Sequence, residues 1–190
     1  MPEQVRQRLS RDDWTAAALR ALAAGGLNAV AIEPLAAALG ATKGSGYWHF
    51  GNRDDLVVAT LDRWEQEHTA EVIAQVQRSS APEVRLRELF HLVMTHAGPN
   101  SVELALLASM ADPRVAAALE RVTHRRLEYL AELFGQCGLP PDDARRRALL
   151  AYTSYLGHAH LARTAPGSVP VGEEREAYLQ SVLSALLDPT

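Results

Sequence analysis

One short segment of this chain concentrates the groups that can bind a charged polymer. Residues 42–56 contain the only lysine among the 190 residues, Lys43, and a Tyr-Trp-His run preceded by two glycines. Each glycine costs a helix about 1 kcal/mol relative to alanine, so a helix that only filled a core would not be expected to keep both. A helix whose backbone presses against a second molecule has a use for them. A turn at Gly40 and an alanine-rich helix precede the segment, and this order predicts a helix-turn-helix that reads DNA.

The residue types along this segment fit contacts with a DNA duplex. Lys43 can reach a phosphate or a guanine edge, and the hydroxyl of Thr42 can cap the helix and bind phosphate. Arg53, at the start of the following helix, can meet a phosphate beside the amide-rich helix end. Tyr47 and Trp48 can instead be packing residues. The predicted DNA contacts are Thr42, Lys43, Gly44, Ser45, Tyr47, Trp48, His49 and Arg53.

The overall charge argues weakly against a nucleic-acid partner. The formal net charge is −4, whereas a DNA-binding protein must place positive charge at least locally. Up to Trp64 the chain has seven Lys and Arg against seven Asp and Glu, so the rest of the chain carries the whole −4. Arg6 and Arg8 precede the first predicted helix and can follow the DNA backbone or belong to a solvated tail.

Cysteine usage and hydropathy indicate the compartment. The one cysteine, Cys137, excludes a disulfide within the chain, which fits a reducing cytosol. The N-terminus has no apolar signal core, and no apolar run approaches the roughly 20 residues that span a bilayer. We therefore expect a soluble, cytoplasmic protein with no membrane partner.

Apolar residues recur at helical spacing along the whole chain, and strand signals are scarce. The pattern predicts an all-α fold with a three-helix DNA-binding head, residues 1–54, and a helical body, residues 55–190. The fourth helix is long enough to tie the head to the body. The nine predicted helices cover residues 11–24, 32–39, 43–50, 53–77, 83–97, 102–111, 113–136, 142–164 and 173–187.

The most specific part of the sequence is the run Lys43-Gly44-Ser45-Gly46-Tyr47-Trp48-His49-Phe50, followed by Asn52-Arg53-Asp54-Asp55-Leu56. In this run and its surroundings, residues 11–64, the chain resembles the TetR/AcrR family of bacterial transcriptional regulators. Two positions depart from the family pattern. Gly46 replaces an apolar residue that packs into the head, which predicts a looser third helix, and Ala31 replaces a hydroxyl residue that caps the second.

The resemblance implies a ligand-responsive regulator, a homodimeric repressor that binds a palindromic double-stranded DNA operator and is released by a small-molecule effector. It implies that the body binds the effector and dimerises. Candidate effector contacts are polar or soft groups on apolar helices: His91, Met94, Thr95, Glu103, Met110, His124, Tyr129, Tyr152, Tyr155 and His158. Candidate interface residues on the last two helices are Leu149, Tyr152, Thr153, Leu156, Leu179, Val182, Leu183 and Leu186.

Other functions are less well supported. Residues 44–46, Gly-Ser-Gly, lack the strand-to-helix setting of a catalytic nucleophile, and no phosphate loop or dinucleotide fingerprint appears, so we expect neither an enzyme nor a cofactor. A metal-responsive regulator is an alternative. However, His158 and His160 point about 200° apart on a helix, and His91 and His96 do not lie on a common helix face either, so neither pair can share a metal ion there. A head that acts through protein contacts rather than DNA is the other alternative: the neutral charge of the head is compatible with it, whereas Lys43, Tyr47 and Arg53 argue against it.

Overall fold

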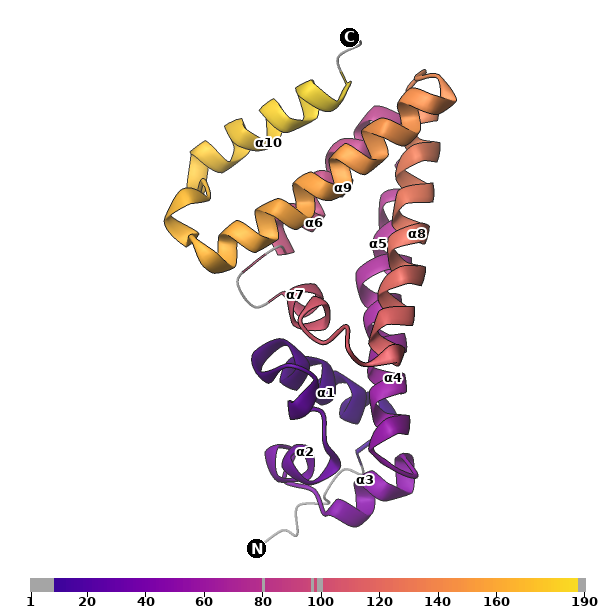
Figure 1. Cartoon of the computed structure of the whole chain (residues 1–190), viewed down its shortest axis with the longest axis vertical. Helices are drawn as coiled ribbons and strands as arrows, with labels where there is room; N and C mark the ends of the chain where they lie inside the picture. Colours follow the sequence, from indigo (N-terminus) through magenta and orange to yellow (C-terminus); the bar gives the residue numbers. More distant parts are fainter. Residues whose placement is uncertain (1–8, 80, 97, 99–100, 188–190) are drawn as a thin grey trace, which may run out of the picture.

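The computed structural model describes residues 9–79, 81–96, 98 and 101–187, and these residues form helices and connecting turns with no strand. The predicted all-α fold is confirmed. Figure 1 shows a small group of helices, α1 to α3, at one end and long helices at the other. The helices are α1 (Arg11–Gly25), α2 (Ile32–Ala38), α3 (Lys43–His49), α4 (Arg53–Glu65), α5 (Glu71–Val76), α6 (Pro82–His96), α7 (Val102–Leu107), α8 (Pro113–Gln136), α9 (Pro141–Thr164) and α10 (Gly172–Leu187).

Side-chain caps set the start of most helices in the head. Ser10 and Asp13 form a reciprocal capping box at α1, in which the Ser10 hydroxyl accepts from the Asp13 amide and the Asp13 carboxylate accepts from the Ser10 amide. Thr42 caps α3 and Asn52 caps α4 by a single bond each, in which the side-chain oxygen accepts from the amide three residues later. Ala31, at the start of α2, supplies no side-chain cap, as its residue type predicts. The turn between α2 and α3 needs Gly40, whose φ is 63°.

The rod between head and body is not the single α-helix predicted for residues 53–77. It consists of α4, a π-helical turn over Gln66–Ala70, and α5, which ends at Val76. Figure 1 shows α4 and α5 following one another alongside α8. Short π segments inside α-helices are uncommon and often lie at functional sites. The backbone conformation of this turn is therefore determined by its contacts with the rest of the protein rather than by the helix propensity of its own residues.

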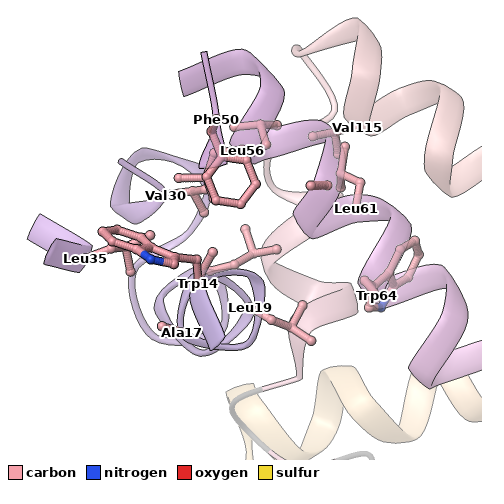
Figure 2. Packing of buried hydrophobic residues seen from close by; sticks show 14 of the residues in the cluster. Trp14, Ala17, Leu19, Val30, Leu35, Phe50, Leu56, Leu61, Trp64 and Val115 are labelled. Atoms are coloured by element: carbon pink, nitrogen blue, oxygen red, sulfur yellow. The ribbon is translucent and has the colours of Figure 1, made fainter. Parts of the chain in front are cut away.

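Two hydrophobic clusters fill the interior, and the first is shared by head and body. It joins Trp14, Leu22, Phe50 and Leu56 of the head and α4 to Leu106 of α7 and to the first half of α8 (Figure 2). The second cluster lies among α5, α6, α8, α9 and α10. Because α7 also packs directly against α1, the head has a second contact with the body besides the rod.

The sixth predicted helix is shorter and less buried than its composition suggested. It ends at Leu107 rather than near residue 111. Ala105 and Leu106 are buried, but Leu107 and Met110 are exposed. The remaining predicted helices end within a few residues of the observed bounds, and the one over residues 113–136 agrees with α8 at both ends.

Candidate DNA-binding surface and ligand cavity

The exposed face of α3 carries most of the predicted DNA contacts. The Thr42 hydroxyl accepts a hydrogen bond from the Ser45 amide at 3.2 Å, which fixes the start of the helix. Lys43 and Gly44 are exposed, as are Tyr47 at 45% and Trp48 at 67%. Tyr47 and Trp48 are adjacent exposed aromatic residues, and together with the exposed Lys43 they give this helix groups that a partner molecule can contact.

Gly46 is buried on the opposite face of α3, and the structure gives the reason for its small size. A Cβ atom built there would lie 2.6 Å from Cγ2 of Ile32 and 2.8 Å from Cη2 of Trp14. Trp14 is fully buried and occupies the space that a side chain at position 46 would need. The expected loosening of the third helix is therefore not what the packing shows, because the tryptophan from α1 fills the gap.

Tyr47 makes a contact within the head that sequence reasoning did not anticipate. Its hydroxyl donates a hydrogen bond of 2.8 Å to Glu33 in the first turn of α2. This bond lowers the pKa of the Glu33 carboxyl and raises the pKa of the Tyr47 phenol. Glu33 thus competes with any phosphate for the Tyr47 hydroxyl, and it places a negative charge on the same surface as Lys43.

His49 and Arg53 also have partners inside the head. A ring nitrogen of His49 lies 2.9 Å from the carbonyl oxygen of Leu9, just before α1. The Arg53 guanidinium donates to the carbonyl oxygens of Val30 and Leu27, each at 2.8 Å, and so holds the turn before α2 against the start of α4. Their predicted phosphate contacts are untested, but each side chain has a structural role. Arg6 and Arg8 lie outside the described residues.

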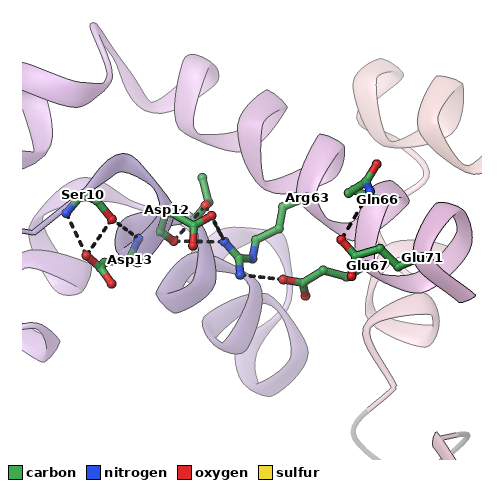
Figure 3. A network of polar contacts seen from close by, with 8 residues as sticks. Ser10, Asp12, Asp13, Arg63, Gln66, Glu67 and Glu71 are labelled. Carbon is green, nitrogen blue, oxygen red and sulfur yellow. Dashed lines mark hydrogen bonds and ion pairs between the residues drawn. The ribbon is translucent and has the colours of Figure 1, made fainter. Parts of the chain in front are cut away.

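A polar network ties the start of α1 to the end of α4 (Figure 3). Arg63 donates to the Asp12 carboxylate at 2.5 Å and to the Thr15 hydroxyl at 3.2 Å, and it also pairs with Glu67 at 2.6 Å. Glu67 lies in the π turn, so the network links the first helix of the head to the point where the rod departs from α-helical geometry. A movement of the π turn would be transmitted to α1 through Arg63.

A cavity of about 530 Å³ lies in the body beside the π turn. This volume is within the roughly 300–1,000 Å³ that small-molecule sites usually have. Its wall comes from the end of α4, the π turn, α5, α6, α7, α8 and α9, and it is mostly apolar and aromatic. The cavity therefore touches both connections between head and body, the rod and α7.

Arg126 of α8 organises the polar end of the cavity. Its guanidinium donates to the Glu103 carboxylate of α7 at 2.7 Å, to the Thr69 hydroxyl at 3.0 Å and to the His68 carbonyl oxygen at 3.1 Å. Burial has the largest single effect and opposes the charge, but Glu103, Tyr155 and Tyr152 together outweigh it and raise the pKa of Arg126. One buried cation thus fastens the π turn and α7 to α8.

Two tyrosines of α9 complete this polar end. The hydroxyls of Tyr152 and Tyr155 each donate to a different oxygen of Glu103, both at 2.9 Å. Burial, followed by the nearby Glu103 charge, raises the pKa of both phenols, so both stay protonated and act as donors. The carboxylate, 4% exposed, therefore receives hydrogen bonds from three side chains.

Four of the predicted effector contacts line the cavity, namely Glu103, Tyr129, Tyr152 and Tyr155. The others lie elsewhere in the described structure, because polarity alone does not say which face of a helix meets the cavity. Met94 is in the second hydrophobic cluster, and His158 is buried against the Tyr178 ring. His91, Thr95, Met110 and His124 are exposed.

Sequence reasoning missed Arg126, Trp64 and Thr69, which line the same cavity. A signal for Arg126 was present. It lies four residues after Val122 and four before Leu130 on the buried stripe of α8, so a charged residue there must find a partner inside. Its neighbour Arg125 is exposed, and two adjacent arginines in a sequence suggest a solvent-exposed position, which is why Arg126 was missed.

The predicted interface residues divide between the surface and the core. Leu149 and Thr153 of α9 are exposed, and Leu156 and Val182 are half-buried. The others are buried within the chain's own second cluster, where they already have apolar neighbours: Tyr152, Leu179, Leu183 and Leu186. These four side chains contact the chain's own core, whereas Leu149 and Thr153 lie on the surface of α9.

Two further classes of site are absent from the described residues. No group of three or more His, Cys, Asp and Glu side chains lies close enough together to hold a metal ion there. No helix in that part of the chain is both long and apolar enough to cross a membrane.

The helical head with its exposed third helix, joined to a helical body with a cavity, defines a helix-turn-helix regulator with a separate ligand-binding region. Residues 15–60 match the family model described as bacterial regulatory proteins, tetR family. Over this N-terminal segment the chain matches the TetR family of transcriptional regulators, and the chain has the fold of a solved TetR regulator. No curated protein matches the chain in sequence.

Solved structures extend the likeness to the whole chain. A TetR transcriptional regulator from Legionella pneumophila is 18% identical, with a TM-score of 0.76, over 96% of this chain and 97% of its own. A TetR-family regulator from Streptomyces coelicolor is 22% identical, with a TM-score of 0.70, over 94% and 90%. AibR, solved with isovaleryl coenzyme A and operator DNA, is 19% identical, with a TM-score of 0.67, over 95% and 99%. At these identities the structures establish the fold, and they are regulators rather than enzymes.

Proposed function

We propose that this protein is a homodimeric repressor that binds a palindromic operator through α3 and releases it when a small molecule enters the cavity. Residues 1–54 would bind DNA, and residues 55–190 would bind the effector and dimerise. The observation that carries the proposal is the position of the cavity, which is bounded by both connections between head and body. A DNA target places such a regulator in the cytoplasm.

The exposed face of α3 supports the DNA-binding part of the proposal. Lys43 stands at the N-terminal end of that helix, where side chains of a recognition helix meet base edges and phosphates. One short helix contacts only a few base pairs, so two half-sites are needed for useful specificity. A homodimer supplies the second helix and explains why the operator would be palindromic.

The rod and α7 support the coupling part. A ligand that changes the contacts of Arg126 acts on the π turn through His68 and Thr69, and on α7 through Glu103. The π turn is linked to α1 by Arg63, and α7 packs on α1 directly. A ligand shifts the protein between two head positions only as far as it binds one of them more tightly. Operator release therefore requires that the ligand-filled cavity favour head positions unsuited to the two half-sites.

Replacing Lys43 with alanine tests the assignment of α3. The operator is first found by selecting genomic fragments bound by the purified protein, and affinity is then measured by fluorescence anisotropy at several salt concentrations. We expect K43A to bind the operator about tenfold more weakly at fixed salt. We also expect the slope of log affinity against log salt concentration to become shallower by roughly one unit, because one cation leaves the interface. Arg163→Ala, which removes an exposed cation on α9, serves as the control and should leave both quantities unchanged. Equal affinity of K43A and the control variant would remove α3 from the DNA interface.

The exposed face of α9 supports a homodimer. Leu149, Thr153, Gly157 and Leu161 are all exposed and follow one another at four-residue spacing, which places them on one side of the helix. Leu150 beside them is also exposed. Leu149, Leu150 and Leu161 thus expose apolar side chains along one side of α9, and a second copy of the same helix can cover them.

A charge in the middle of this face should prevent association. Leu149→Glu would bring two carboxylates together across a two-fold axis, so we expect a monomer by light scattering coupled to size exclusion. Val84→Glu, at an exposed apolar position of α6, is the matched control and should stay dimeric. A dimer that survives L149E, or a wild-type protein that is monomeric at micromolar concentration, would contradict the assignment.

A further inference from the structure

We propose that the cavity is a receptor for uncharged, largely apolar molecules, and that Glu103 is the residue that excludes carboxylates and other anions from it. The inference rests on the proposed function, because it assigns a chemical class to the effector. It concerns selection at the polar end of the cavity, where Glu103 and Arg126 meet.

Without Glu103, this end of the cavity would be an anion site. Arg126 is a cation whose side chain is only 14% exposed, and a guanidinium presents a planar fork that suits carboxylate and phosphate oxygens. Tyr152 and Tyr155 add two hydroxyl donors close to the same point. A carboxylate placed there would receive hydrogen bonds from all three side chains.

Glu103 already is that carboxylate. It is held on α7 with one oxygen facing Tyr152 and the other facing Arg126 and Tyr155. An incoming anion must displace it, which breaks three hydrogen bonds, or lie beside it, which brings two negative charges together in a site shielded from water. Either arrangement is unfavourable, so the internal carboxylate occupies the position that an acidic ligand would need.

The wall also disfavours a cation at this end. A positive ligand group near Glu103 would lie beside the Arg126 guanidinium and be repelled. Two of the aromatic rings that could attract it already have a cation nearby, because the Arg126 guanidinium carbon lies 5.7 Å from the Trp64 ring centre and 6.0 Å from that of Tyr155. At this end of the cavity, the charges of Arg126 and Glu103 therefore neutralise each other within the wall.

The rest of the wall is suited to apolar contact. It is formed by side chains of α5, α6 and α8 that bring hydrocarbon or aromatic surface to the cavity, among them Val72, Ile73, Leu89, Phe90, Val93 and Leu130. Glu71 adds a further carboxylate to the lining, which accepts a hydrogen bond of 3.3 Å from the neutral Gln66 amide and again opposes an anion. An uncharged molecule can fill this space without having to displace the Glu103 carboxylate.

Two dyes of the same ring skeleton test the ligand class. N-phenyl-1-naphthylamine is uncharged, and 8-anilino-1-naphthalenesulfonate adds one negative sulfonate, while both fluoresce more strongly in an apolar site. We expect the wild-type protein to bind the uncharged dye at least about tenfold more tightly than the sulfonate. In Glu103→Gln, which keeps the shape and removes the charge, the sulfonate should gain at least about tenfold, with the uncharged dye little changed.

Two controls locate and validate the binding. Val72→Trp, which fills the cavity from α5, should abolish binding of the uncharged dye. Dye that still bound to this variant would be adsorbed to the protein surface rather than held in the cavity. Circular dichroism establishes whether E103Q and V72W are folded. The wild-type comparison of the two dyes stands alone if E103Q does not fold, and Glu103→Ala then provides a second test of the gain in sulfonate affinity.

Several results would overturn the proposal. These are a wild-type protein that binds the sulfonate as tightly as the uncharged dye, no binding of the uncharged dye, equal binding to V72W, and an unchanged preference in folded E103Q. Operator affinity is measured separately, without dye. If the protein fails the dye test but binds its operator, only the proposed ligand class is refuted. If it passes the dye test but binds no operator, the proposed function as a DNA-binding regulator is refuted and the ligand class still holds.

Discussion

Replacing Arg126 with methionine is expected to lower the free energy of unfolding by about 3–5 kcal/mol, because it leaves the Glu103 carboxylate buried without a cation. The change also removes the bonds to His68 and Thr69, so the π turn should lose its attachment to α8. Urea unfolding followed by circular dichroism, at fixed protein concentration, measures the loss.

A surface ion pair provides the matched control. Arg145 pairs with Asp142 one turn earlier on α9, and both side chains are largely exposed. Arg145→Met should cost less than about 1 kcal/mol. The double variant Arg126→Met/Glu103→Leu should recover part of the loss, because it replaces both charges with apolar groups. A cost for R126M no larger than that for R145M would show that the buried pair does not hold the rod and α7 in place.

Replacing Gly46 with alanine is expected to destabilise the protein by about 1–2 kcal/mol, even though alanine is the better helix former. Overpacking a filled core costs about 1–3 kcal/mol, while the gain in helix propensity is at most about 1 kcal/mol. The added methyl group would meet Ile32 and Trp14 at distances that real Cβ atoms do not show. Chemical unfolding followed by circular dichroism gives the difference.

Gly44 is the control on the same helix, because a Cβ there would meet only the Thr42 hydroxyl oxygen at 3.8 Å. Gly44→Ala should therefore stabilise the protein by up to about 1 kcal/mol. In a Trp14→Phe background, which removes the ring atoms nearest position 46, G46A should cost less, with a coupling energy on the order of 0.5–3 kcal/mol. Equal effects of G46A and G44A would mean that Trp14 does not determine the residue at position 46.

The helices could be read from the sequence because their signals are local. Ser10, Thr42 and Asn52 are residue types that commonly cap helices, and each caps the helix that follows it, while α8 shows its apolar stripe and its proline start. The π turn could not be predicted in this way. It lies in a segment with an ordinary helical pattern, and the side chain bonded to it, Arg126, is 57 residues away from Thr69 in sequence.

The candidate sites show the same division between local and distant causes. Lys43 and its neighbours were found because their residue types are unusual for a helix. The bond from Tyr47 to Glu33 was missed because it depends on how α2 and α3 pack. In the body, polar residues such as Glu103 and Tyr155 were identified by type, but helical spacing alone could not separate Tyr152, which faces the cavity, from Leu149, which faces outward.

The shared first cluster limits how the head can move. Trp14 and Phe50 of the head belong to the same buried set as Leu106 and Val115, so the division at residue 54 in sequence is not a gap in the packing. A change of head position must repack this cluster or carry α7 with it. Such a movement is small and collective rather than a free swing on a linker.

The π turn also fixes the direction in which α3 points. An α-helix rotates by about 100° per residue, and a π turn holds one residue more than the α turn it replaces. Compared with an uninterrupted α-helix, the extra residue among Gln66–Ala70 therefore rotates the part of the chain before it, α3 included, by about a quarter of a revolution about the rod axis relative to the body. In the proposed dimer, symmetric half-sites would require matching azimuths in the two copies, so one additional amino acid in each rod would set the angular alignment of the two heads with the operator.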